Sequence, residues 1–123
     1  MRMLITLAAI SCGLVLGHSG ALADASRFAG TYKPAGPQFS SWDCVSIGQD
    51  GGALLVTPDT FVGVETQCKL RRPVAVNGMN ATLFDAECAG EGYEWVERIM
   101  FMLSDEGRLF YVRDGFAGEW VRC

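Results

Sequence analysis

The amino-acid sequence predicts an all-β fold: a small antiparallel meander, barrel or sandwich of about seven or eight strands that is closed by disulfides. Three observations lead to this prediction. Short runs of β-branched and aromatic residues alternate with glycine-containing turns throughout residues 24–123. Four cysteines follow an N-terminal segment that is typical of a secretion signal. No histidine follows that segment.

Residues 1–23 have the three parts of a secretory signal peptide. A basic residue precedes the almost wholly apolar run 4–16, and residues 21–23 give the small-x-small pattern that signal peptidase needs. The run is about thirteen residues long, whereas a membrane-spanning helix needs about 20. We therefore expect cleavage after the signal, and a single soluble β domain of residues 24–123 in the periplasm or outside the cell. The mature form is expected to have no membrane span.

Taken in chain order, the pattern predicts strands that are separated by recognisable turns. Prolines and glycines between 33 and 41 mark a loop, and Asp50-Gly51-Gly52 marks a tight turn. Because Pro73 has no N–H group for strand pairing, the strand that contains it is expected to be an edge strand or to be broken. The eight clear runs are 28–33, 42–47, 53–57, 60–67, 81–88, 93–103, 108–113 and 119–123, and 69–76 follows less clearly.

The long apolar run 93–103 is ambiguous, because several of its apolar residues would also line one face of a helix. We favour a strand. Residues 104–107 end in glycine and can join this run directly to 108–113 as a tight hairpin.

The cysteines of the mature domain predict two disulfides, because their number is even and the domain is small and exported. Three pairings are possible. If each run reverses the direction of the one before it, Cys68 and Cys88 fall at one end of the sheet, and Cys44 and Cys123 at the other. We therefore predict Cys68–Cys88 and Cys44–Cys123. Alternation along the strands also predicts that Cys88 and Cys123 are buried.

Most catalytic chemistry lacks its usual residues in the mature domain. His18 leaves with the signal, so neither a Ser-His-Asp nor a Cys-His arrangement can form. The cysteines lack the close pairs of a zinc site. Glu91, Glu94 and Glu97 could supply paired carboxylates, but alternation places Glu97 on the opposite face from Glu94. We expect no enzymatic activity, no catalytic residue, no metal and no cofactor.

The charge balance points to the class of partner. The chain has ten basic and 14 acidic residues, and loss of Arg2 with the signal leaves nine basic residues and a formal charge of −5. This balance argues against nucleic acid, which calls for basic patches, and suits a cationic partner. Arg71 and Arg72 form the one basic cluster, which is either solvated or paired with the acidic loops.

Two segments are candidate binding loops, because binding residues often lie on segments that a rigid scaffold holds. One contains proline and an aromatic residue in a polar context, and the other combines acidic and aromatic residues. In so small a domain, most aromatic side chains are expected in the core instead. The candidate residues are Gln38, Phe39, Ser40, Ser41 and Trp42 in the first loop, and Glu91, Tyr93, Glu94 and Trp95 in the second.

The signal segment, the small all-β domain, the structural cysteines and the net acidity together resemble the small periplasmic lysozyme-inhibitor proteins of Gram-negative bacteria. The resemblance covers the general layout only. The Ser-Gly-x-x-Tyr loop that inhibitors of the c-type group insert into the enzyme cleft is absent, and residues 38–42 do not match it. The segment Phe28-x-Gly30-x-Tyr32 is also similar to the first strand of lipocalin-like barrels.

This resemblance implies a non-enzymatic binding protein that inhibits lysozyme or another cationic peptidoglycan hydrolase. One alternative is an envelope accessory module that binds glycan or a component of a secretion system. A further alternative is a lipocalin-like carrier of a small ligand, which would require an internal cavity.

Overall fold

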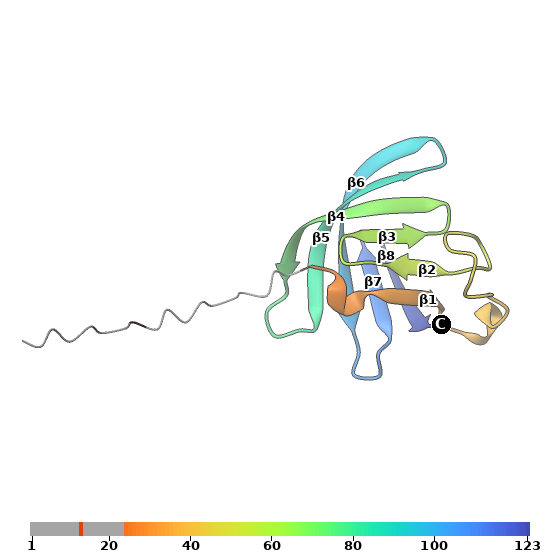
Figure 1. Cartoon of the computed structure of the whole chain (residues 1–123), viewed down its shortest axis with the longest axis horizontal. Helices are drawn as coiled ribbons and strands as arrows, with labels where there is room; N and C mark the ends of the chain where they lie inside the picture. Colours follow the sequence, from red (N-terminus) through yellow and green to blue (C-terminus); the bar gives the residue numbers. More distant parts are fainter. Residues whose placement is uncertain (1–12, 14–23) are drawn as a thin grey trace, which may run out of the picture.

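The computed structural model describes residue 13 and residues 24–123, so the expected signal peptide lies largely outside the described residues. The chain folds as a closed antiparallel barrel of eight strands, in which each strand pairs with the next and β8 pairs with β1 (Figure 1). The all-β prediction is confirmed. The elements are the 3₁₀ turns η1 (Ser26–Phe28) and η2 (Pro37–Phe39), and the strands β1 (Gly30–Pro34), β2 (Leu54–Val56), β3 (Thr60–Gly63), β4 (Thr66–Ala75), β5 (Ala81–Gly90), β6 (Tyr93–Leu103), β7 (Leu109–Arg113) and β8 (Phe116–Arg122).

The antiparallel order gives the barrel two different ends. The β1–β2 loop and the β3–β4, β5–β6 and β7–β8 turns lie at one end, which we call the loop end. The other end is covered by η1, and we call it the helix end. Arg27 of η1 donates to the carbonyl oxygen of Ala81 at 2.9 Å and to the side-chain oxygen of Asn80 at 3.0 Å, which fixes η1 against the start of β5.

Aromatic side chains fill the interior of the barrel. Phe28 of η1 enters the core, and the hydroxyl of buried Tyr32 donates to the Phe28 carbonyl oxygen at 2.6 Å. Phe101 lies at the centre of this cluster, because its ring lies 5.7 to 6.4 Å from five other aromatic rings. The buried aromatic residues are Phe28, Tyr32, Phe61, Phe84, Phe101, Tyr111 and Trp120.

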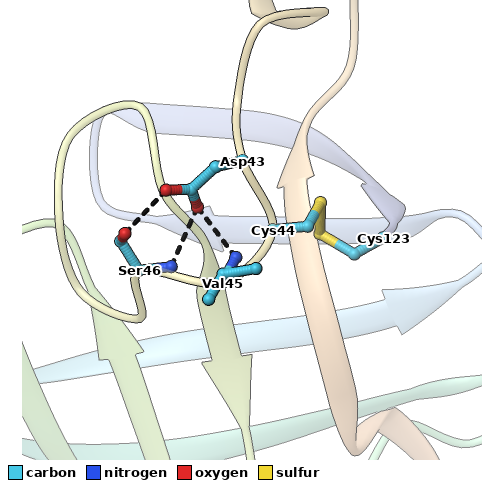
Figure 2. The surroundings of a disulfide bond; sticks show 5 residues. All are labelled: Asp43, Cys44, Val45, Ser46 and Cys123. Carbon is cyan, nitrogen blue, oxygen red and sulfur yellow. Dashed lines mark hydrogen bonds between the residues drawn. A yellow bond between two sulfur atoms is a disulfide. The ribbon is translucent and has the colours of Figure 1, made fainter.

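Both predicted disulfides are confirmed. Cys68 and Cys88 are buried and lie directly opposite each other on β4 and β5, with their Cα atoms 4.0 Å apart. The second disulfide joins Cys44 of the β1–β2 loop to Cys123, just after β8 (Figure 2). The prediction that Cys123 is buried was wrong. It shares a face with Val121 by alternation, but that is the outer face of the barrel, and Cys123 is exposed.

The predicted strand 42–47 does not form. Cys44 has a left-handed backbone conformation with φ of 59°, which lies outside the extended region that regular strand pairing requires. The Asp43 carboxylate accepts hydrogen bonds from the N–H groups of Val45 and Ser46, both at 2.8 Å, and from the Ser46 hydroxyl at 2.6 Å (Figure 2). These local hydrogen bonds hold the chain in a turn and compete with strand pairing.

The division between the third and fourth strands also differs from the prediction. The run 60–67 was expected to be continuous, but the chain turns at Glu65, whose φ is 51°. The following strand continues to Ala75 with a break in register between Arg71 and Val74. This bulge contains Pro73, which has no N–H to contribute to the ladder, so Pro73 disturbs the pairing as expected, although the strand continues.

The ambiguous run 93–103 is a strand, β6, as favoured. It pairs with β5 along its whole length and with β7 over its second half only.

Candidate functional site

The first candidate loop serves partly as a structural element. The Phe39 ring packs edge-on against Trp42 with centroids 6.0 Å apart, and Trp42 packs against the core. Both rings are therefore half-buried. Gln38, Ser40 and Ser41 are exposed, so this loop offers a polar surface and little free aromatic area.

The second candidate loop is more open. Tyr93 has 75% of its surface exposed, and Glu91 and Glu94 are also exposed, whereas Trp95 is half-buried against the core. Val96, which follows on the same strand, is 65% exposed and was not singled out in the sequence. The β5–β6 hairpin therefore presents both apolar and acidic side chains to the solvent.

The structure does not join the two candidate loops into one surface. In Figure 1, η2 lies at the lower right of the barrel and the β5–β6 hairpin at its top, so the two loops are separated in this view. This separation follows from the strand order, in which β1 and β2 lie across the barrel from β5 and β6.

Three acidic residues from three separate connections gather instead. Glu65 lies in the β3–β4 turn, Glu91 in the β5–β6 turn and Asp50 in the β1–β2 loop, and we call these residues the acidic rim. Gly90 allows the two hairpins to approach, because a Cβ atom at this position would lie 2.3 Å from the carbonyl oxygen of Glu65. The Glu65 N–H donates to the carbonyl oxygen of Gly48 at 2.9 Å, which holds the β1–β2 loop beside the β3–β4 turn.

The charges of the acidic rim repel one another. The pKa of Glu65 is raised above its usual value, because Glu65 and Glu91 share a hydrogen bond that favours the protonated acid and because the Glu91 charge repels a second carboxylate. Asp50 adds a smaller repulsion. Within residues 24–123, no ion pair engages Asp50, Glu65, Glu91 or Glu94. From the sequence, Asp50 was expected only in a turn, and Glu65 was not among the candidate residues.

We expect Glu65→Gln to raise the melting temperature at pH 7 and to leave it unchanged well below pH 4.5, the ordinary pKa of the group. A raised pKa means that the folded state binds this proton more tightly than the unfolded state does. The stability linked to Glu65 is therefore complete below the unfolded pKa and is lost as the pH rises through the folded pKa. Calorimetry as a function of pH measures the effect.

Glu106→Gln is the matched control, since Glu106 is exposed in the β6–β7 turn at the helix end. Equal melting temperatures for Glu65→Gln and the unchanged protein at pH 7 would show that the rim charges do not repel one another.

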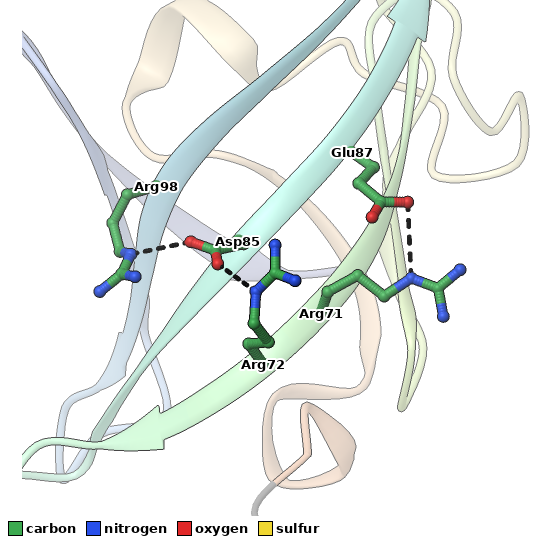
Figure 3. A network of polar contacts seen from close by, with 5 residues as sticks. All are labelled: Arg71, Arg72, Asp85, Glu87 and Arg98. Carbon is green, nitrogen blue, oxygen red and sulfur yellow. Dashed lines mark hydrogen bonds and ion pairs between the residues drawn. The ribbon is translucent and has the colours of Figure 1, made fainter.

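Arg71, Arg72 and Arg98 pair with carboxylates of β5 and not with the acidic rim (Figure 3). Asp85 of β5 accepts hydrogen bonds from Arg72 at 2.6 Å and from Arg98 at 3.0 Å, and these partners lower the pKa of Asp85. Arg71 pairs with Glu87 at 3.5 Å. Both Arg71 and Arg72 are exposed and their partners lie on β5, so the possible pairing with the acidic loops is wrong. Such exposed pairs contribute little to the stability of a fold.

A second polar cluster lies on the inner face of β6 and β7. Tyr111 points its hydroxyl at Glu97 at 3.4 Å, and Arg113 lies 3.6 Å from the same carboxylate. Burial and the neighbouring Glu97 raise the pKa of Tyr111 to about 12. Glu94 lies on the outer face, as expected, so Glu94 and Glu97 cannot flank one substrate.

An open depression of about 670 Å³ lies beside the acidic rim on β3 to β6. It combines apolar residues with charged and amide side chains. The lining residues are Thr60, Phe61, Val62, Gln67, Cys68, Lys69, Glu87, Cys88, Ala89, Glu94, Trp95 and Val96.

Among the residues that the structure describes, no group of His, Cys, Asp and Glu side chains is arranged to hold a metal ion. No helix in the described part of the chain has the length and apolar character needed to cross a membrane. Comparisons with protein-family models, with curated protein sequences and with solved structures found no match.

Proposed function

We propose that this protein is a non-enzymatic binding protein of the periplasm or the extracellular space that inhibits lysozyme or another cationic peptidoglycan hydrolase. The observation that carries the proposal is the acidic rim, with exposed Tyr93 beside it on the β5–β6 hairpin. The two disulfides fit an oxidising compartment of this kind.

Electrostatics supports a cationic partner. Carboxylates that repel one another in the free protein are stabilised when a positive charge docks between them. Their negative field also raises the rate at which a cationic partner associates. Arg71 and Arg72 of β4 and Arg98 of β6 already have acidic partners on β5, so these three arginines do not neutralise the rim. Lysozymes of the c-type are cationic, which is the chemistry that this surface would recognise.

The scaffold also favours tight binding. Cys68 lies three residues after Glu65 and Cys88 three residues before Glu91, so one disulfide anchors both rim hairpins. A surface that is already ordered loses less conformational entropy when it docks.

A turbidity assay tests the proposal. Purified oxidised protein should slow the lysis of bacterial cells by a c-type lysozyme or another basic hydrolase, and this inhibition should weaken as the salt concentration rises. The double variant Glu65→Lys and Glu91→Lys should lose inhibition by about tenfold or more, because it replaces attraction with repulsion at the centre of the surface.

Glu106→Lys and Asp105→Lys together provide the control, since this double variant makes the same change of net charge at the helix end. Unimpeded lysis at a large molar excess across several hydrolases would end the proposal. Equal loss of inhibition in both double variants would refute the role of the rim.

The depression favours a second candidate, a module that binds glycan. Carbohydrate-binding surfaces place aromatic faces beside polar groups, and Trp95 lines this depression together with Gln67 and Glu87. This candidate would be favoured if the protein is retained on purified sacculi, if Trp95→Ala abolishes this retention, and if the protein inhibits no hydrolase. The carrier interpretation has no comparable support, because aromatic side chains fill the barrel interior.

A further inference from the structure

One strand of the barrel has an edge that lacks a partner. β6 pairs with β5 from Tyr93 to Met102, but it pairs with β7 only from Ile99 to Leu103. Residues 93–98 therefore have a neighbouring strand on one side only. In Figure 1 this part of the β5–β6 hairpin is the outermost ribbon at the top of the molecule.

The Cys68–Cys88 disulfide indicates which backbone N–H and C=O groups of β6 point toward this unpaired edge. The Cα atoms of Cys68 and Cys88 are 4.0 Å apart, the close spacing of a pair without backbone hydrogen bonds, so the polar groups of Cys88 point to β6 and meet Trp95. The backbone polar groups of Glu94 and Val96 then point the other way. The Leu103 N–H, which donates to Asn80 on the β5 side, agrees with this alternation.

These backbone groups are open to a partner. Among the described residues, none of the backbone hydrogen bonds outside the strand pairs involves 93–98. The side chains there do not shield the edge, since Val96 is 65% exposed. An exposed edge with free N–H and C=O groups can pair with a strand of another chain.

The order of the side chains on the outer face of β6 indicates that this other chain is a second copy of the protein. Glu94, Val96 and Arg98 alternate along β6 as an acid, an apolar residue and a base. Antiparallel pairing of two copies centred on Val96 would place Val96 against Val96 of the second copy, and Glu94 against Arg98 of the second copy, twice. Arg98 uses its Nε to bind Asp85, so its terminal N–H groups are left for this contact.

The neighbouring registers are less favourable. Centring on Trp95 places Glu94 against Val96 of the second copy, and centring on Glu97 places two carboxylates opposite each other. Only the register centred on Val96 pairs opposite charges and also joins residues whose backbone groups both face the edge.

We propose that two copies of this chain associate by antiparallel pairing of their β6 edges over residues 94–98, which extends the β5–β6 sheets of both barrels into one. The proposal concerns a surface other than the acidic rim and does not depend on hydrolase inhibition.

Sedimentation equilibrium of the exported, oxidised protein over a wide concentration range tests the proposal. We expect a reversible dimer of twice the monomer mass, and hydrogen exchange at the Val96 amide that slows as dimer forms. Glu94→Arg should weaken association by about tenfold or more, because each of the two charge contacts becomes repulsive. The double variant Glu94→Arg with Arg98→Glu should restore association.

Glu106→Arg is the matched control and should leave association unchanged, since it makes the same charge change at the helix end. Val96→Pro should abolish dimer formation while the barrel stays folded, because the lost N–H faces the free edge. A monomer at all concentrations would overturn the proposal. So would a dimer that Glu94→Arg does not weaken, or one that the double variant does not restore.

Discussion

Replacement of Cys44 and Cys123 by serine is expected to lower the free energy of unfolding by about 4.5 kcal/mol. The bridge spans a sequence separation of 79 residues, and the entropy that such a cross-link removes from the unfolded chain grows with the length of the closed loop. The loss would be a large share of the roughly 5–15 kcal/mol that stabilises a typical domain. Both cysteines lie outside the core, so the substitution itself should add little further cost.

The second disulfide provides the comparison. It spans a separation of 20 residues, for which the same relation predicts about 3.3 kcal/mol. Because Cys68 and Cys88 are buried, alanine is the better replacement, and a cavity will add to the loss. Urea denaturation followed by tryptophan fluorescence measures both variants. Unchanged stability after removal of the Cys44–Cys123 bridge would mean that the β1–β2 loop and the end of β8 are held without it.

Phe101→Ala is expected to lower the free energy of unfolding by about 3–5 kcal/mol. Phe101 is fully buried and contacts rings from η1, β3, β5, β7 and β8, so the substitution leaves a cavity where these elements meet. Such a dense aromatic centre cannot refill the space without moving several strands.

Phe110→Ala is the matched control. Phe110 lies on β7 next to Tyr111 but on the opposite, outer face, where it is only half-buried. Substitution by alanine should therefore lower the free energy of unfolding much less at Phe110 than at Phe101. Urea denaturation with both disulfides intact measures the two changes, and equal losses would contradict the assignment of Phe101 to the centre of the core.

Local patterns were enough to predict much of the fold. The run 93–103 was correctly favoured as a strand because a glycine-containing turn follows it at hairpin spacing. The disulfide pairing also followed from the reversal of direction at successive turns. The pattern failed at 42–47, because Val45 and Ile47 alternate as in a strand while Asp43 holds the backbone in a turn.

The sequence by itself therefore determined the all-β class, the two bridges and an acidic surface charge, since each depends on residue type and short-range periodicity. Only the tertiary structure decided where the charge is concentrated. Asp50, Glu65 and Glu91 are far apart in the chain, and they meet because barrel closure brings three connections to one end and because Gly90 lets two hairpins touch. The free edge of β6 likewise arises from the unequal lengths of β6 and β7, a property of strand pairing that no single segment encodes.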